Sequence, residues 1–179
     1  MTKLVDKIER SNSSPTDLRN QEVIYPVRDS QYGDLETPIN SSVFVRRFVG
    51  NLSAYRPGLS PLRRGLEVGL AHGYLLVGPF AKFNPLRYTE SGTLVALLST
   101  LGLVLISSVL IVLYAASNPP KPLSATAAPT PPDAFQSKKG WNDYAKGFLL
   151  GGAVGAIAAY FILANFDVYG NFLTLIGAK

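Results

Sequence analysis

Apolar residues gather in three segments of the chain, whereas the first sixty residues are mostly polar. The stretch from Thr93 to Ala115 carries no charged residue over 23 positions, and Phe148 to Phe166 carries none over 19. The remaining segment, Leu66 to Phe80, is shorter and contains two ionisable residues. Because about 20 apolar residues span a bilayer as a helix, the pattern predicts transmembrane helices over about 61–83, 93–115 and 144–166.

Turn and cap signals mark the ends of these helices. Ser60 before Pro61 supplies a capping hydroxyl and a proline at the first helical position. Gly78-Pro79 either ends the first helix or kinks it. Six prolines lie between Asn118 and Phe135, and such a segment favours extended backbone. We therefore expect a Pro-rich loop over 118–135, acting as a spacer or as a rigid arm that touches a neighbouring subunit.

The N-terminal part lacks a sustained helical period up to about residue 45 and contains scattered turn formers. It predicts an extended arm that needs a docking surface to become ordered. Residues 42–49 alternate apolar pairs with an arginine pair, which is typical of a short amphipathic helix at a membrane interface. The predicted fold is an all-α membrane protein of three transmembrane helices, with an arm over 1–60, a membrane domain over 61–179 and a C-terminal tail over 167–179.

Basic residues are unevenly distributed around the predicted spans. Ten of the 17 Lys and Arg residues precede Leu66, where the first apolar segment begins, and four lie between the second and third apolar segments. The positive-inside rule places the N-terminus and the second loop on the cytoplasmic side and the first loop and C-terminus on the other. The net charge of +5 is explained by these flanking residues, because no aromatic-basic platform for nucleic acid is present.

Composition excludes several kinds of chemistry. The absence of cysteine excludes disulfides, thiolate-bound zinc and iron–sulfur clusters. A single histidine excludes bis-histidine haem within one chain. No nucleophile is set beside a histidine and a carboxylate, and Gly151-Gly152-Ala153-Val154-Gly155 does not match the dinucleotide fingerprint. We therefore predict no enzymatic activity and no small-molecule substrate.

Small residues recur every fourth position on two of the predicted helices. The first carries Gly65, Gly69 and Gly73, and the third carries Gly147, Gly151, Gly155 and Ala159. Such stripes let a neighbour approach the backbone closely. The neighbour is either another helix or a flat ring cofactor. The second helix has only Gly102 and a Ser107-Ser108 pair, so we expect it to be more exposed to lipid.

The two ionisable residues of the first predicted helix are Glu67 and His72. An unpaired carboxylate near the centre of a membrane helix costs about 3 kcal/mol. Glu67 either pairs with Arg63 or Arg64, or forms the ion site of a small transporter, or joins His72 in ligating metals inside ring cofactors. Five residues separate the pair, which turns them by about 140° and sets them about 7.5 Å apart along the axis. They are therefore expected to serve separate partners, with the neighbouring glycines leaving room for a ring.

Two longer runs carry a family resemblance. Residues Phe48 to Pro61 and Arg64 to Tyr74 closely resemble subunit XI of photosystem I, the PsaL-type subunit. Gly78-Pro79-Phe80, Pro85-Leu86-Arg87 and Gly140-Trp141 resemble it too, and the similarity extends from about Thr37 to the C-terminus. The resemblance favours pigment ligation over the other interpretations of the two ionisable residues.

The resemblance implies a non-catalytic cyanobacterial thylakoid subunit that binds antenna chlorophyll a and β-carotene and forms the contact between photosystem I monomers. Glu67 and His72 occupy positions that resemble the family's axial magnesium ligands, and Tyr55 and Arg56 lie in the matching segment that lines a chlorophyll. The implied partners are photosystem I core subunits, small membrane subunits, copies of the chain itself and lipids. The N-terminus is then cytoplasmic, on the stromal side, and the C-terminus lumenal. The alternatives are a small cation transporter using Glu67 and a cofactor-free assembly subunit.

Two features depart from trimer-forming relatives. These tend to carry aspartates after Pro-Leu-Arg, where calcium can bind, whereas this chain reads Tyr88-Thr89-Glu90-Ser91 and offers only Glu90. The Pro-rich loop is longer and resembles that of relatives associated with tetrameric or dimeric photosystem I. We therefore expect a tetramer, with a trimer as the alternative, and no firm calcium site.

Overall fold

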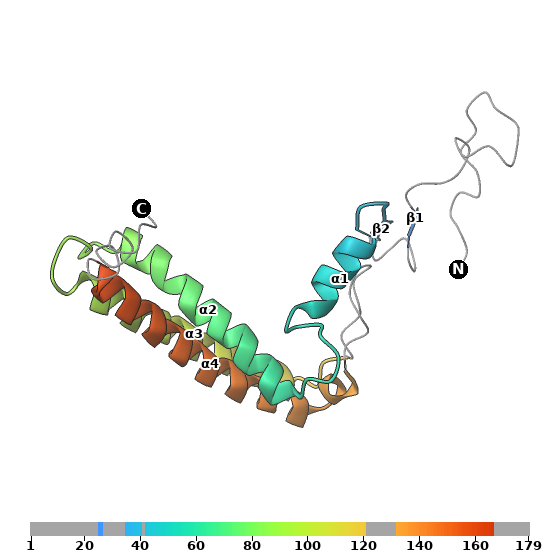
Figure 1. The fold of residues 1–179 in the computed structure, drawn as a ribbon. Coiled ribbons are helices and arrows are strands. Elements are labelled where there is room, and N and C mark those ends of the chain that lie inside the picture. The colour runs from blue at the N-terminus through green and yellow to red at the C-terminus, as the bar shows by residue number, and fades with distance from the viewer. Residues whose placement is uncertain (1–24, 27–34, 41, 121–131, 167–179) are drawn as a thin grey trace, which may run out of the picture. The chain divides into compact units, whose positions relative to one another are not determined.

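The computed structural model describes residues 25–26, 35–40, 42–120 and 132–166, which fall into two units. One unit holds two short strands, β1 (Tyr25–Pro26) and β2 (Leu35–Glu36), and helix α1 (Val43–Asn51). The other holds α2 (Pro61–Phe83), α3 (Gly92–Ala116), the 3-10 helix η3 (Asp133–Gln136) and α4 (Lys138–Ala164). Figure 1 labels these elements. The outer parts of the predicted arm, most of the Pro-rich loop and the tail over 167–179 lie outside the described residues.

The smaller unit is built from local contacts. β1 and β2 pair antiparallel, with Tyr25 opposite Glu36. Helix α1 begins after Ser42, whose hydroxyl accepts a hydrogen bond from the Val45 N–H at 3.3 Å. The rings of Phe44 and Phe48 stack on its exposed surface with centroids 6.5 Å apart. The helix expected over 42–49 is therefore present, and its place at a membrane interface stays a prediction.

Two helices of the larger unit, α3 and α4, are long and apolar enough to cross a membrane, with mean hydropathies of 2.6 and 2.0 in their most apolar windows. Helix α2 has 23 residues and continues through Pro79. It covers the predicted range 61–83, but its ionisable residues leave it less apolar than the other two. Length and composition therefore support two of the three predicted spans, α3 and α4, and the span at α2 stays a prediction.

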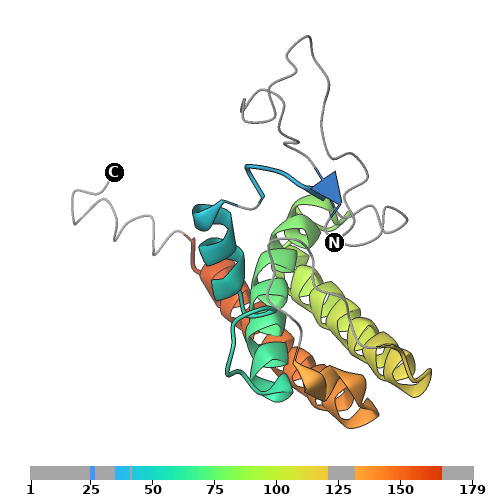
Figure 2. The same cartoon turned by 90° about the vertical axis from the view of Figure 1, so that its right-hand side faces the viewer.

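The tightest packing in the larger unit lies between α2 and α4, which run side by side in Figures 1 and 2. A β-carbon added to Gly65, Gly69 or Gly73 of α2 would collide with backbone atoms of α4. The same addition to Gly147, Gly151 or Gly155 of α4 would collide with backbone atoms of α2. We call this contact the glycine seam. It confirms the helix-packing interpretation of both stripes, and the prediction that Gly69 and Gly73 leave room for a ring is wrong because α4 fills that space.

Helix α3 packs through a second row of small side chains at four-residue spacing. Its buried residues include Ala96, Thr100, Val104 and Ser108. The hydroxyls of Thr100 and Ser108 donate to the carbonyls of Ala96 and Val104, at 2.9 and 2.8 Å, so each stays hydrogen-bonded inside its own helix. Only 28% of the apolar window of α3 is buried, against 39% for α4. Helix α3 is thus the more exposed of the two, as its sparse glycines predicted.

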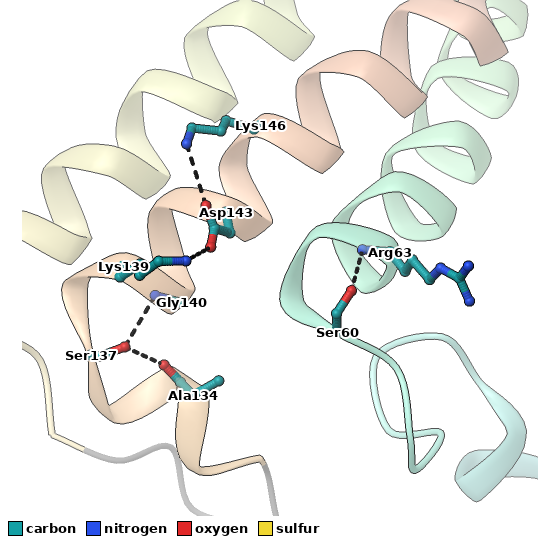
Figure 3. A network of polar contacts seen from close by, with 8 residues as sticks. All are labelled: Ser60, Arg63, Ala134, Ser137, Lys139, Gly140, Asp143 and Lys146. Atoms are coloured by element: carbon teal, nitrogen blue, oxygen red, sulfur yellow. Dashed lines mark hydrogen bonds and ion pairs between the residues drawn. The ribbon is translucent and has the colours of Figure 1, made fainter.

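Polar side chains close the ends of α2 and α4. The Ser60 hydroxyl accepts from the Arg63 N–H at 3.3 Å, and the Ser137 hydroxyl accepts from the Gly140 N–H at 3.1 Å (Figure 3). Ser137 therefore starts α4 at Lys138, earlier than the span predicted from about residue 144. The reason is that hydropathy marks the apolar part of a helix and misses a polar first turn. Likewise, the end of the predicted 118–135 loop is helical, as η3.

Candidate functional site

His72 lies on the flank of α2, next to the glycine seam. It comes three residues after Gly69, which places it about 60° around the helix from the seam. Its imidazole is exposed on the surface of the chain. One edge of the ring approaches the buried ring of Phe148 on α4, with centroids 5.5 Å apart and planes inclined by 58°. Because the seam holds the two backbones together, the position of this imidazole is set by both helices.

A hydrogen bond to the backbone decides which nitrogen of His72 can act as a ligand. The Nδ1 atom lies 2.8 Å from the carbonyl oxygen of Val68, one turn earlier. A carbonyl only accepts, so Nδ1 carries the hydrogen, and in the neutral imidazole Nε2 keeps its lone pair. A second-shell bond of this kind fixes the tautomer and orientation of a metal-bound histidine. The residue therefore fits a role as a single axial nitrogen donor to a metal in a ring cofactor.

Glu67 lies on a different side of the same helix. It precedes Gly69 by two residues, which turns it about 160° away from the seam. Its side chain is partly buried. Helix α2 is continuous through both residues, so Glu67 and His72 keep the angular separation expected from their spacing. Among the described residues, no group of three or more His, Cys, Asp or Glu side chains gathers to hold a metal ion. The arrangement accordingly suits two separate partners, and a pairing of Glu67 with Arg63 or Arg64 stays a prediction.

The other two predicted site residues lie outside the helical unit. Tyr55 and Arg56 follow α1 in a turn in which both backbone N–H groups donate to the carbonyl of Leu52, at 2.9 and 2.7 Å. Both side chains are partly buried. They belong to the unit of α1, whereas Glu67 and His72 belong to the unit of α2. Their predicted role beside a chlorophyll therefore stays a prediction.

Two features of the helical unit were not predicted from the sequence. Arg64 is only 2% exposed, and its Nη2 group donates to the Leu59 carbonyl at 3.4 Å. Asn84 is buried between α2 and α3, where its Nδ2 group donates to Phe80 O at 2.8 Å and to Gly92 O at 3.3 Å. The Asn84-Pro85 pair signals a turn but does not show that the amide bridges two helices.

Aromatic side chains cluster where α3 ends and α4 begins. Trp141 contacts three rings, with centroids 5.1 Å from Tyr114, 4.7 Å from Phe135 and 6.0 Å from Tyr144. Its indole N–H donates to the Phe135 carbonyl at 2.9 Å. Tyr114 belongs to α3, Phe135 to η3, and Trp141 and Tyr144 to α4. The cluster therefore ties η3 to both helices.

Comparison with known proteins identifies relatives of this chain. Residues 22–168 match the family of photosystem I reaction centre subunit XI. A curated protein of that name from Mastigocladus laminosus is 55% identical over 166 residues, covering 92% of this chain and 96% of the relative. The corresponding protein of Trichormus variabilis is 54% identical, covering 91% and 95% of the two chains. That of Synechococcus elongatus is 46% identical, covering 81% and 89%.

Proposed function

This chain belongs to the photosystem I reaction centre subunit XI family, and we propose that it is a non-catalytic, pigment-binding subunit of photosystem I in the thylakoid membrane. In this proposal α2 is the third transmembrane helix, alongside α3 and α4. His72 and Glu67 supply axial ligands to the magnesium of two separate chlorophyll a molecules. Chlorophyll, when bound, supplies light absorption and excitation transfer. The chain supplies the ligand atoms and fixes where they stand.

The hydrogen bond from His72 Nδ1 to Val68 O is the observation that carries the proposal. It leaves Nε2 as an exposed lone pair on a helix placed in hydrocarbon. A polar atom left without a hydrogen bond in an apolar medium costs about 2–7 kcal/mol. Magnesium bound at that atom offsets the cost and uses the lone pair as a donor. The seam and the Phe148 ring hold the imidazole in one orientation, which an antenna pigment requires.

Replacement of His72 by leucine tests this assignment. We expect the purified photosystem I to lose one chlorophyll for each copy of the chain, or to show a shifted band in its low-temperature absorption spectrum. Tyr74→Leu is the matched control, because Tyr74 is also exposed on α2 and has no assigned ligand role. Unchanged pigment stoichiometry and spectra in the His72 variant would show that the ligand is wrongly assigned.

Membrane orientation and partners follow from the family and from the charge distribution. We place the N-terminus and the α3–α4 connection on the cytoplasmic side and the C-terminus in the lumen. The chain contacts core subunits, small membrane subunits and lipids, and it mediates contact between photosystem I monomers. Its pigments include β-carotene, and Tyr55 and Arg56 line one chlorophyll. A tetramer is favoured over a trimer by the Pro-rich connection, and the mass of the complex on a native gel separates the two.

Two other functions make different predictions. A cation transporter that uses Glu67 would be colourless after purification, and Glu67→Gln would abolish ion uptake into proteoliposomes. A cofactor-free assembly subunit would leave the number of pigments per core unchanged after deletion, although the complex would break up. The proposal of pigment binding predicts chlorophyll in the band that copurifies with the tagged chain.

A further inference from the structure

A groove between α3 and α4 lies away from both proposed pigment ligands. It has a volume of about 450 Å³ and is lined from α3 mainly by the aliphatic side chains Leu105, Val109, Val112 and Leu113. From α4 it is lined by Asn142, Ala145, Lys146 and Leu149. It occupies the C-terminal half of α3 and the N-terminal half of α4, which are the lower ends of the yellow and orange helices in Figure 2. The walls suit a hydrocarbon chain that runs parallel to the helices.

Two polar groups stand on the α4 side of this groove, one turn apart. The Oδ1 atom of Asn142 is buried and accepts no hydrogen bond. A buried amide oxygen in that state costs about 1–3 kcal/mol, so a hydroxyl donor at this position is stabilising. A half-turn of the amide exchanges its oxygen and nitrogen and lets it accept from a hydroxyl or donate to an acidic oxygen. The ligand therefore carries oxygen-bearing groups above its hydrocarbon part.

The net positive charge at the mouth of the groove favours a ligand with a negative charge. Lys146 lies 3.3 Å from a carboxylate oxygen of Asp143, and Lys139 lies 2.7 Å from the other oxygen (Figure 3). Two ammonium groups thus share one carboxylate, which leaves one positive charge. The Lys146 side chain is 68% exposed, so it can reach the headgroup level from the edge of the groove.

We propose that this groove binds one anionic phospholipid with a hydroxylated headgroup, namely phosphatidylglycerol. An acyl chain lies along the aliphatic wall, the phosphate faces Lys146, and a glycerol hydroxyl meets the Asn142 amide. Basic pockets between helices on the cytoplasmic side bind acidic headgroups by the same physical means. The site rests on the proposed membrane insertion of α3 and α4, and it is independent of pigment ligation by α2.

The test measures lipid binding in the complete photosystem I. Complexes containing wild type, Lys146→Gln, or the control Lys138→Gln are washed with detergent and titrated with tritiated dioleoylphosphatidylglycerol. Lys138 is exposed in the same helix and does not line the groove. One basic residue near an acidic headgroup contributes about 1 kcal/mol, so Lys146→Gln is expected to weaken the affinity of one site per chain about fivefold. The control should match wild type.

Two further variants separate charge, shape and pigment effects. Val109→Trp places bulk in the groove at a half-exposed position, and it should remove the same lipid without changing charge. Asn142→Leu should also reduce binding. Equal phosphatidylglycerol binding in wild type and Lys146→Gln would refute the site, as would equal competition by dioleoylphosphatidylcholine or loss of a pigment in place of the lipid. Chlorophyll per core is read on the same samples, and a pigment loss confined to His72→Leu keeps the two proposals distinguishable.

Discussion

Replacement of Gly69 by alanine tests the glycine seam at its centre. The added β-carbon would collide with the Phe148 carbonyl oxygen and would lie 2.8 Å from the Phe148 Cα. Ordinary van der Waals contact begins at 3.4 Å, so this second contact alone must lengthen by at least 0.6 Å. The atoms in the way are backbone atoms. No rotamer change can relieve the overlap, and α4 has to move away from α2.

The energetic consequence can be estimated from two opposing terms. Overpacking of a close contact costs about 1–3 kcal/mol. Alanine in place of glycine inside a helix gains up to about 1 kcal/mol. The Gly69→Ala variant is therefore expected to lose up to about 2 kcal/mol of unfolding free energy. Gly78 lies on the same helix with nothing within 4 Å of its added β-carbon, so Gly78→Ala keeps only the favourable term.

The assay is unfolding of the full-length chain in mixed detergent micelles, titrated with sodium dodecyl sulfate and followed by far-ultraviolet circular dichroism. The two variants carry the same chemical change on one helix. The structure predicts that Gly69→Ala lowers the free energy of unfolding and that Gly78→Ala raises it. A displaced α4 also moves Phe148 relative to His72, so pigment spectra of the complete photosystem should change in Gly69→Ala alone. Equal midpoints for the two variants would show that α2 and α4 do not meet through this seam.

Three other substitutions probe the helix junctions. Asn84→Ala removes the amide that donates to Gly92 O across the α2–α3 turn, and it should cost about 1–3 kcal/mol in the same titration because buried carbonyls lose their donor. Trp141→Phe keeps the ring cluster but loses the 2.9 Å bond to Phe135 O, so a loss of about 1 kcal/mol is expected. Ser137→Ala removes the cap of α4 and should cost about 0.5–2 kcal/mol. The expected result is a lower unfolding midpoint, with the helix content before addition of sodium dodecyl sulfate unchanged.

Hydrophobic pattern and cap chemistry were sufficient to predict the main helices. The Ser60-Pro61 pair marks the start of α2, and uncharged stretches mark the bodies of α3 and α4. The start of α4 was placed too late because its first turn is polar and is stabilised by Ser137, which hydropathy does not register. The row that includes Thr100 and Ser108 was also missed. Hydroxyls in an apolar run appear polar in the sequence, although each is satisfied by the carbonyl four residues earlier.

The candidate site was predictable as a pair of residues but not as a geometry. A histidine and a carboxylate in a predicted membrane helix point to function because each is costly in hydrocarbon. A stripe of glycines shows that something approaches the backbone closely, but it does not show whether that neighbour is a helix or a ring. Only the paired stripe on α4, placed in three dimensions, decides between them. The free nitrogen of His72 likewise depends on a rotamer that brings Nδ1 to the Val68 carbonyl.

The seam also bears on the proposed ligand role of His72, because it fixes the backbone from which the imidazole extends. Large apolar side chains cover the outer surfaces of α2, α3 and α4 and are mostly exposed, so they can adapt to whatever lipid, pigment or helix covers them. The inner contact between α2 and α4 is backbone against backbone, and backbone atoms have no rotamers with which to adapt. His72 flanks this contact, so its Cα is held in place by the most tightly packed part of the helical unit. In the proposed function, a donor atom beside the seam combines a fixed ligand position with a surface that can fit many neighbours.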